Sequence, residues 1–228
     1  MEAIILAGGF GTRLAQVVRD VPKPMAPVAG KPFLQYLADD LIEQGVTRMV
    51  FAVCYKKEVI MSFFGKEYRG AEVCYSVEEQ PLFTGGAIRL AQAQCREDRV
   101  LVLNGDSYLG MDLRGMRAFA EKRNAPVVIA VRQMTNFSRY GEVSVNERSE
   151  ITAFHEKRFC EKGFINGGIY DVAHNALDGY PVKFSIENEC FPELVKNGSL
   201  LAFPADGMFI DIGIPEDYER AQQLFKGR

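Results

Sequence analysis

Glycines and one arginine gather near the start of the chain, at residues 6–13. Their order is Leu-Ala-Gly-Gly-Phe-Gly-Thr-Arg, directly after an apolar run. Glycine adopts backbone conformations that other residues avoid, and it lets amide N–H groups come close to an anion. Arg13 adds a positive charge beside those amides. The segment is typical of a phosphate-binding turn, although the same glycines also suit a structural bend.

Two common phosphate-binding patterns do not fit this segment. The dinucleotide fingerprint needs a third Gly or Ala where Leu14 stands, and the expected second strand ends at Cys54 without an acidic residue. The Walker A pattern needs a Gly-Lys-Ser/Thr ending that these glycines do not lead into. The sequence therefore argues against both a dinucleotide fingerprint and a P-loop.

Lys23 is a second basic residue near these glycines, and it lies between Pro22 and Pro24. Each proline restricts the backbone around it, so the lysine is presented with little conformational freedom. We predict that Lys23 presents its positive charge to a ligand. A rigid surface loop is the alternative.

Two aspartates have settings that suit a metal ion. Asp106 follows the apolar run 100–103, and the carboxyl end of a central strand is where α/β sheets bind ligands. Asp211 lies among apolar residues, where a carboxylate without a partner would be costly. A shared Mg²⁺ would offset the cost for both side chains. The alternative is that Asp106 caps a turn and Asp211 pairs with a basic group.

Hydrophobic patterning predicts the elements that must position these residues. Apolar runs, each expected to be a strand buried on both faces, occur at residues 3–7, 49–53, 73–77, 100–103 and 127–131. Amphipathic helical stretches lie at 33–44, 57–64, 86–94 and 113–122. Further strands are expected at 141–145, 151–155, 164–170, 200–203 and 208–212, and a closing helix at 215–225. We predict one α/β domain with a Rossmann-like, mostly parallel sheet, helices on both faces and a smaller antiparallel subregion.

Composition limits the classes of function. The 228 residues are 47% hydrophobic, which is enough for one sizeable core. With 27 basic and 30 acidic side chains, the formal charge of −3 gives no overall field to attract nucleic acid or an anionic membrane. The five cysteines lack C-x-x-C spacing and predict reduced thiols, and the apolar N-terminus is too short for a signal or a membrane span. We therefore expect a cytoplasmic protein that binds neither nucleic acid nor membrane.

Several segments together resemble the signature of sugar-1-phosphate nucleotidylyltransferases. Residues 6–14, the Pro-Lys-Pro at 22–24 and the Gly-Lys-Pro at 30–32 carry the N-terminal part of this resemblance. Segments similar to the family's base-recognition loop and sugar pocket lie at 80–87, 140–143, 154–157 and 165–170. One departure is Phe83, where the family usually has Gly.

The resemblance implies Mg²⁺-dependent attack by a sugar 1-phosphate oxygen on the α-phosphorus of a nucleoside triphosphate, with pyrophosphate leaving. It implies catalytic roles for Arg13 and Lys23, and Mg²⁺ binding by Asp106 and Asp211. The implied nucleotide-binding residues are Leu6, Ala7, Gly8, Gly9, Gly11, Thr12, Gln80 and Gly85. The implied sugar-phosphate-binding residues are Gly141, Glu156, Lys157, Asn166 and Gly167.

Within this family, the chain most resembles the D-glycero-α-D-manno-heptose 1-phosphate guanylyltransferases, which implies GTP and that sugar phosphate as substrates. A nucleotide-binding half over about 1–125 and a sugar-binding half over about 126–228 are expected, without the C-terminal β-helix of larger relatives. Two alternatives stay open: transfer from UTP, dTTP or CTP to a hexose 1-phosphate, and a catalytically silent nucleotide-sugar-binding protein. Because related short members often pair, we also expect a homodimer.

Overall fold

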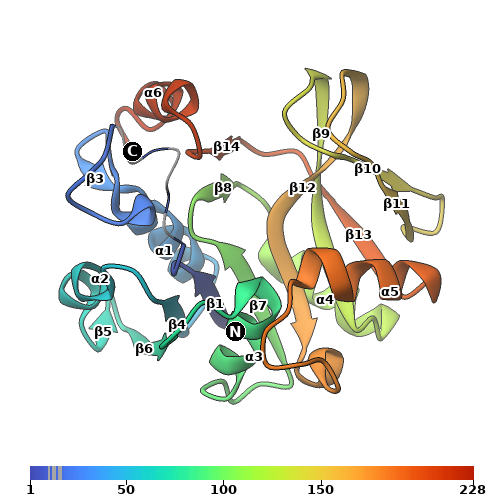
Figure 1. The fold of residues 1–228 in the computed structure, drawn as a ribbon, viewed down its shortest axis with the longest axis horizontal. Coiled ribbons are helices and arrows are strands. Elements are labelled where there is room, and N and C mark those ends of the chain that lie inside the picture. The colour runs from blue at the N-terminus through green and yellow to red at the C-terminus, as the bar shows by residue number, and fades with distance from the viewer. Residues whose placement is uncertain (10, 12–13, 15–16) are drawn as a thin grey trace.

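The computed structural model describes residues 1–9, 11, 14 and 17–228. Ten strands of this part form one sheet in the order β11-β10-β12-β7-β1-β4-β6-β5, with β9 on β12 and β13 on β9 (Figure 1). Its strands are β1 (Glu2–Leu6), β4 (Arg48–Val53), β5 (Glu67–Tyr68), β6 (Ala71–Val77), β7 (Arg99–Asn104), β9 (Val127–Phe137), β10 (Glu142–Val145), β11 (Ile151–Phe154), β12 (Cys160–Ala173) and β13 (Leu200–Ala205).

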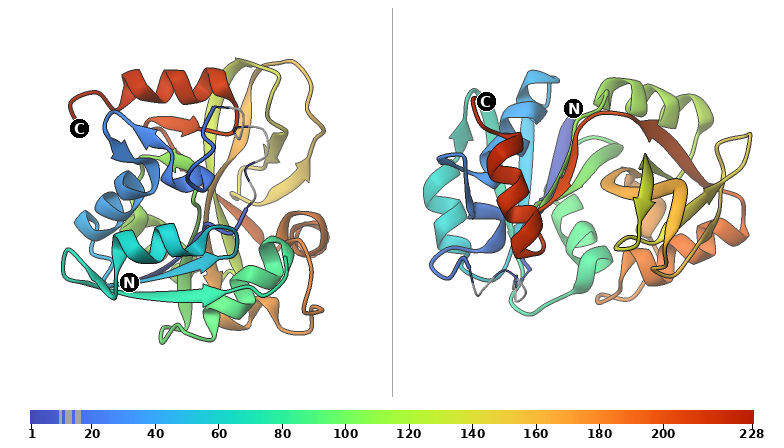
Figure 2. Two further views of the ribbon diagram at one scale, coloured as in Figure 1. Left: turned by 60° about the vertical axis from the view of Figure 1, so that its left-hand side comes forward. Right: turned by 90° about the horizontal axis from the view of Figure 1, so that it is seen from above.

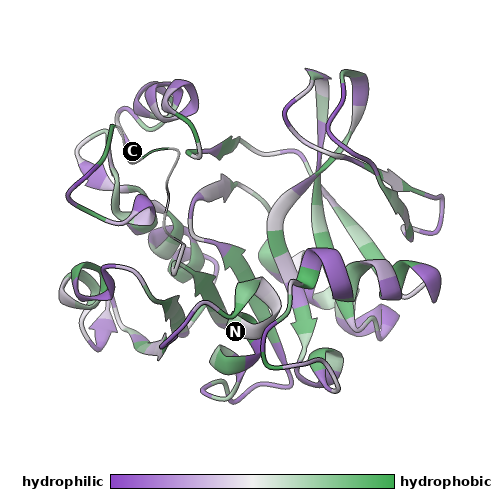
Figure 3. Cartoon of the chain, in the orientation of Figure 1, coloured by the Kyte–Doolittle hydropathy of each residue, from purple (hydrophilic) through white to green (hydrophobic). Residues whose placement is uncertain are grey.

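The parallel part of the sheet is covered by helices on both faces, as predicted. β1 pairs in parallel with β4 and β7, and β4 pairs in parallel with β6. Because side chains alternate along a strand, Ile5 packs on one face and Ile4 on the other. The first face is covered by α1 (Phe33–Glu43), α2 (Lys57–Phe64) and α4 (Leu113–Arg123), and the second by α3 (Phe83–Gln92) and α5 (Phe191–Lys196). Figure 3 shows hydrophobic residues concentrated on these inner strands.

The predicted antiparallel subregion is built around β12. This long strand runs antiparallel to β7, β9 and β10, and β10 pairs with β11. Its register against β9 shifts between Asn166 and Tyr170, and Gly168 has a φ of +75° in this stretch. Such a shift is typical of a β-bulge, which bends β12 next to the half-buried Asn166.

The last segment returns to the elements formed by the first half of the chain (Figure 2). β14 (Phe209–Asp211) pairs with β8 (Ser107–Leu109), and α6 (Pro215–Leu224) follows. After α6, the Phe225 ring packs against Tyr36 and Tyr108, with centroids 4.4 and 5.2 Å away. The last segment therefore packs against the first half of the chain, and the division into a nucleotide-binding and a sugar-binding half near residue 125 stays a prediction.

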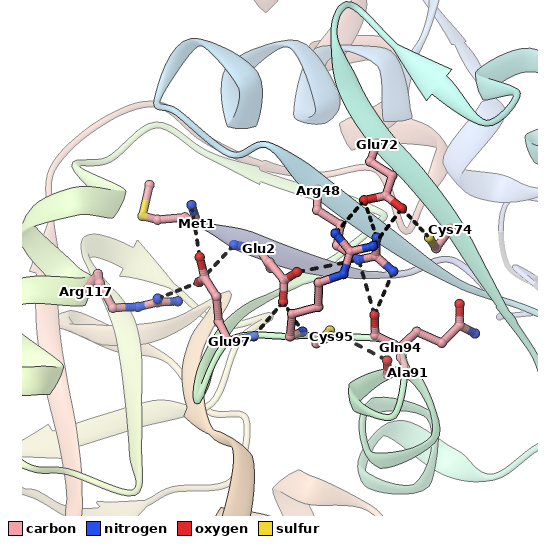
Figure 4. Close-up of polar contacts among 11 residues, drawn as sticks. Met1, Glu2, Arg48, Glu72, Cys74, Ala91, Gln94, Cys95, Glu97 and Arg117 are labelled. Carbon is pink, nitrogen blue, oxygen red and sulfur yellow. Dashed lines mark hydrogen bonds and ion pairs between the residues drawn. The ribbon is translucent and has the colours of Figure 1, made fainter.

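A network of ion pairs lies at the amino end of the parallel strands. Figure 4 shows the Arg48 guanidinium between Glu72 and Glu2, with the Glu2 contact at 3.5 Å. The backbone N–H groups of Arg96 and Glu97 donate to Glu2 Oε2 at 2.6 and 3.0 Å. Glu2 is buried, but these donors satisfy its carboxylate.

The fully buried Asp171 extends this network on β12. Arg99 and Arg117 donate to its two carboxylate oxygens at 2.7 and 2.6 Å. Arg117 also pairs with Glu97 at 3.1 Å, and the Met1 amine lies 3.3 Å from the same carboxylate. Charged side chains of β7, α4 and β12 therefore belong to one ion-pair network.

Some local predictions were wrong or incomplete. The run at 73–77 is not buried on both faces, because β6 lies near the edge of the sheet and is flanked there only by the two-residue β5. The patterning also missed β8, α5 and the π-helix Ile186–Cys190, and the short hairpin of β2 (Pro27–Val28) and β3 (Lys31–Pro32).

The cysteines and the helices also bear on the predictions made from composition. All five cysteines are free, as predicted. In the described part of the chain, no helix is both long and apolar enough to cross a membrane.

Candidate active site

A cavity of about 440 Å³ opens at the carboxyl ends of the parallel strands. Its walls come from β1 and the glycine turn, from the ends of β4, β6 and β7, and from the start of α3. The lining residues are Leu6, Gly8, Gly9, Gly11, Lys23, Pro24, Ala52, Cys54, Glu78, Pro81, Phe83, Thr84, Ala87, Asn104, Asp106, Glu187 and Gly213. Ligands of α/β sheets bind at this edge.

The glycine turn and the Pro-Lys-Pro segment meet at Gly11. This residue has a φ of +59°, and a Cβ placed on it would lie 2.7 Å from Lys23 Cβ. Both the conformation and the close approach therefore require glycine here. Gly8 leaves similar room, because a Cβ there would lie 3.0 Å from a carboxylate oxygen of Glu78. Thr12 and Arg13, predicted to bind nucleotide and to act in catalysis, lie outside the described residues.

Lys23 joins the two aspartates that the sequence singled out. Its ammonium donates to Asp106 Oδ2 at 2.5 Å and lies 3.6 Å from Asp211 Oδ1. The Gly213 N–H donates to Asp211 Oδ1 at 2.7 Å, and the Ser107 hydroxyl donates to Asp106 Oδ1 at 3.2 Å. Pairing of β14 with β8 brings the two carboxylates together, with Asp211 opposite Ser107 in the register.

Among the described residues, Lys23 is the ion-pair partner of both carboxylates, so one positive charge faces two negative ones. Burial raises the pKa of Asp211 and the negative charge of Asp106 raises it further, although the Lys23 ammonium opposes both effects. The ionised form of Asp211 is therefore held at a cost. A site of this kind gains from a second positive charge.

The donors fit a magnesium ion that is held mainly by its substrate. In such sites the protein usually supplies one or two carboxylates to Mg²⁺, and substrate phosphate oxygens and water supply the rest. Among the described residues, no group of three or more His, Cys, Asp or Glu side chains is arranged to hold a metal. Asp106 and Asp211 would thus leave most of the coordination sphere to phosphate and water.

The lining of this cavity includes a carboxylate that the sequence reasoning missed. Glu78 directly follows β6, and its Oε2 accepts a hydrogen bond from the Leu82 N–H at 2.9 Å. Burial raises the pKa of Glu78, and no basic side chain pairs with it in the described part of the chain. Its place after an apolar strand was the same signal that identified Asp106. Gln80, predicted for the base, is exposed and outside the cavity lining.

Glu187 is a second missed residue of this cavity, contributed by the π-helix. Its carboxylate accepts hydrogen bonds from the Thr84 hydroxyl and from the Ser185 hydroxyl, the latter at 2.9 Å. π-Helical turns are rare and often occur at functional sites. No sequence signal in the apolar pattern indicates this turn.

A second cavity, of about 470 Å³, lies on the other side of the aspartate pair. It is lined by Ser138, Arg139, Tyr140, Gly141, Lys157, Asn166, Asp211 and Ile214. Three residues predicted to bind the sugar phosphate are among them. Arg139 was missed; its guanidinium pairs with Asp217 at 2.6 Å.

The remaining predicted residues lie outside both linings. Glu156 is exposed, and Ala7 is buried with its N–H bonded to the Ala52 carbonyl at 2.8 Å. A Cβ on Gly85 would overlap the Phe184 ring, and one on Gly167 would overlap a Leu109 methyl group. The absence of a side chain at Gly85 and Gly167 is thus explained by packing. Their binding roles stay predictions.

Comparisons with known proteins agree with this geometry. The family model described as nucleotidyl transferase matches residues 2–227. The chain is 41% identical over 226 residues to the D-glycero-alpha-D-manno-heptose 1-phosphate guanylyltransferase of Aneurinibacillus thermoaerophilus, covering 98% of this chain and 97% of the relative. It is 42% identical over 220 residues to the enzyme of the same name from Campylobacter jejuni, covering 96% and 97%.

Solved structures give the same picture. The crystal structure of HddC from Yersinia pseudotuberculosis superposes with a TM-score of 0.87 at 35% identity, and 99% of each chain is covered. Its complex with GMP-PN gives a TM-score of 0.86 with the same coverage.

Proposed function

The chain belongs to the nucleotidyl transferase family, and we propose that it transfers GMP from GTP to D-glycero-α-D-manno-heptose 1-phosphate, releasing pyrophosphate. One observation carries the proposal. Asp106 lines the first cavity, Asp211 lines the second, and Lys23 contacts both carboxylates. The cluster of Lys23, Asp106 and Asp211 thus borders both cavities. The first is large enough for a nucleotide, and the second is lined by Lys157 and Asn166.

The proposed reaction is an in-line attack by an oxygen of the sugar phosphate on the α-phosphorus of GTP. This oxygen is already ionised at neutral pH, so the site needs positioning and charge neutralisation rather than a general base. Asp106 and Asp211 would hold Mg²⁺, which when bound would neutralise charge on the α-phosphate. Lys157 would hold the sugar phosphate, and Lys23 would steady the charge that develops at phosphorus.

The glycine turn would receive the leaving pyrophosphate through its backbone amides. Gly8, Gly9 and Gly11 all line the first cavity, which supports this assignment. Arg13, which follows these glycines in the sequence, would add positive charge for the pyrophosphate. Together these groups stabilise negative charge without forming a covalent intermediate.

Glu78 supports guanine as the base. Guanine is the base that presents two adjacent donors, N1–H and the N2 amino group, which a carboxylate can accept together. Adenine and cytosine place an acceptor beside their amino group, and uracil and thymine place N3–H between two carbonyls. A half-buried carboxylate with no basic partner among the described residues therefore fits guanine better than any other base.

A substrate matrix tests the proposal directly. Pyrophosphate release is measured for GTP, UTP, dTTP and CTP, each with heptose and hexose 1-phosphates, with Mg²⁺ and with EDTA. We expect Mg²⁺-dependent turnover that is fastest with GTP and the heptose 1-phosphate. A faster reaction with UTP would contradict the guanine assignment. Thermal stabilisation by nucleotides without product in any pair would indicate a catalytically silent binding protein.

A variant at Glu78 sharpens the base assignment. Glu78→Gln keeps an acceptor for the Leu82 N–H but replaces one acceptor facing the base with a donor. We expect kcat/KM for GTP to fall by roughly tenfold or more, and the ratio of GTP to UTP activity to fall with it. Glu79→Gln, one residue along and exposed, is the matched control. An unchanged ratio in Glu78→Gln would exclude Glu78 as the base-reading residue.

We also propose a cytoplasmic location and a homodimer. Light scattering on the purified protein tests the second point. A monomer mass at micromolar concentration would contradict it.

A further inference from the structure

Phe83 is an exposed aromatic residue on the wall of the nucleotide cavity. It begins α3, it is 58% exposed, and it lines the same cavity as Glu78. A ring this exposed contributes little to the core, because most of its apolar surface is left in water. Packing in the core therefore does not explain the position of this side chain.

The backbone at Phe83 adds to this question. Its φ is +59°, in the left-handed region that glycine adopts freely and other residues adopt at a cost. The non-glycine residues with positive φ in the described chain are Ala29, Lys56, Arg69, Phe83, Asn124, Asn136 and Ser149, and Phe83 is the only aromatic one among them. A strained backbone that is retained at a ligand cavity commonly has a functional role.

Neighbouring contacts place Phe83 beside both a basic and an acidic side chain. The Lys183 ammonium lies 4.8 Å from the ring centroid in a cation–π contact, and the side chain is still 58% exposed. The preceding residue, Leu82, donates its N–H to Glu78. Phe83 therefore directly follows the residue whose N–H binds Glu78, and both side chains line the same cavity.

We propose that Phe83 is the surface on which the nucleobase stacks while its edge meets Glu78. This inference rests on the proposed nucleotide site and adds a contact that determines affinity and base preference. A purine covers more of a phenyl ring than a pyrimidine does, so the ring favours GTP over UTP. Stacking on a protein aromatic ring contributes through the π-face of the base, and the strained backbone holds that ring at the cavity.

Three substitutions at position 83 separate stacking from strain. Phe83→Gly and Phe83→Ala both remove the ring, but only Ala keeps the unfavourable backbone conformation. Phe83→Trp keeps an aromatic face. Phe63→Ala removes an exposed ring on α2, outside the cavity lining, and is the matched control.

Three quantities are measured for each variant: Kd for GMP by calorimetry, KM for GTP, and Tm. We expect Phe83→Gly and Phe83→Ala to weaken GMP binding and raise KM for GTP by about tenfold each. We expect Phe83→Gly to melt about 2–4 °C above Phe83→Ala, because glycine relieves the strain. Phe83→Trp and Phe63→Ala should bind GMP within about twofold of wild type.

The outcomes distinguish this inference from the proposed function. If wild type turns over GTP but Phe83→Gly binds GMP as tightly as wild type, Phe83 does not stack on the base. If Phe83→Trp loses affinity as Phe83→Gly does, an aromatic face is not what the site uses. Absence of GTP turnover in wild type would instead overturn the proposed function.

Discussion

The two ends of the parallel sheet differ in how many basic groups pair with their acidic side chains. At the amino end, Asp171 has two arginines and Glu97 has both an arginine and the N-terminal amine. At the carboxyl end, Asp106 and Asp211 share one lysine, and Glu78 has no basic partner among the described residues.

The directions of the pKa shifts follow this difference. Burial alone would raise the pKa of Glu97, but its hydrogen bond with Arg117 and the charge of the N-terminal amine lower it. Burial and a neighbouring carboxylate raise the pKa of Asp211. We call the amino end, where acidic and basic groups are paired, the balanced end, and the carboxyl end the unbalanced end; the unpaired charge of the latter supports the proposed ligand site.

The largest expected effect breaks the unbalanced end. Asp106→Asn removes one proposed metal ligand and the 2.5 Å partner of Lys23. We expect kcat to fall on the order of 10²–10³-fold, because charge at the transferring phosphate loses its stabilisation. Pyrophosphate release gives the rate, and the Tm should stay near the wild-type value. A rate within twofold of wild type would remove Asp106 from the proposed mechanism.

The second effect breaks the balanced end. Asp171→Asn leaves two arginines near a neutral buried side chain, and losing one partner of a buried ion cluster costs about 3–5 kcal/mol. We expect the Tm to fall by roughly 10 °C. KM for GTP, measured well below the Tm of the variant, should stay at the wild-type value. Glu72→Gln at the exposed rim of the network should lower the Tm much less. Equal losses in the two variants would show that burial of Asp171 carries no special weight.

A smaller effect concerns the contact between the glycine turn and Lys23. Gly11→Ala introduces a Cβ that would lie 2.7 Å from Lys23 Cβ, on a backbone with φ of +59°. We expect activity to fall roughly tenfold to a hundredfold as Lys23 is displaced. Gly65→Ala has a similar φ of +62° but nothing within 4 Å of the new Cβ, so it isolates the backbone cost. Similar kinetics in the two variants would refute a positioning role for Gly11.

The smallest effect is a pH dependence of opposite sign at the two ends. The folded state holds the proton on Asp211 more strongly than the unfolded state, so this group reduces stability as pH rises from its ordinary pKa of 3.8 through its raised value. Glu97 does the reverse, adding stability as pH rises through its lowered pKa towards 4.5.

Melting curves of two variants across the acidic range test these signs. The Tm of Asp211→Asn relative to wild type should increase with pH, and that of Glu97→Gln should decrease. Profiles with the same sign would mean that the two ends do not differ in this way.

The main sheet was predictable because its signal is local. The strand that ends before Asp106 and the helix 57–64 are each marked by the spacing of their own apolar residues, and both are confirmed. The burial of β6, next to the edge of the sheet, was predicted wrongly, since an apolar run does not reveal which neighbours cover it.

The site was predictable only where its residues follow strands or carry a motif. Asp106 and Lys23 were identified in this way, and the structure brings them together. The close approach of Lys23 to Gly11, the place of Arg139 and the filling of the space beside Gly85 by Phe184 depend on contacts between distant segments. No local pattern encodes such contacts.

The pairing of β14 with β8 has a consequence for the order of assembly. Asp211 is synthesised long after Lys23 and Asp106, although all three belong to one cluster. During synthesis the chain therefore carries Lys23 and Asp106 well before the carboxylate of Asp211 is added to them. The proposed metal site is thus complete only when the last segment has docked, because the pairing of β14 with β8 places Asp211 beside Lys23 and Asp106.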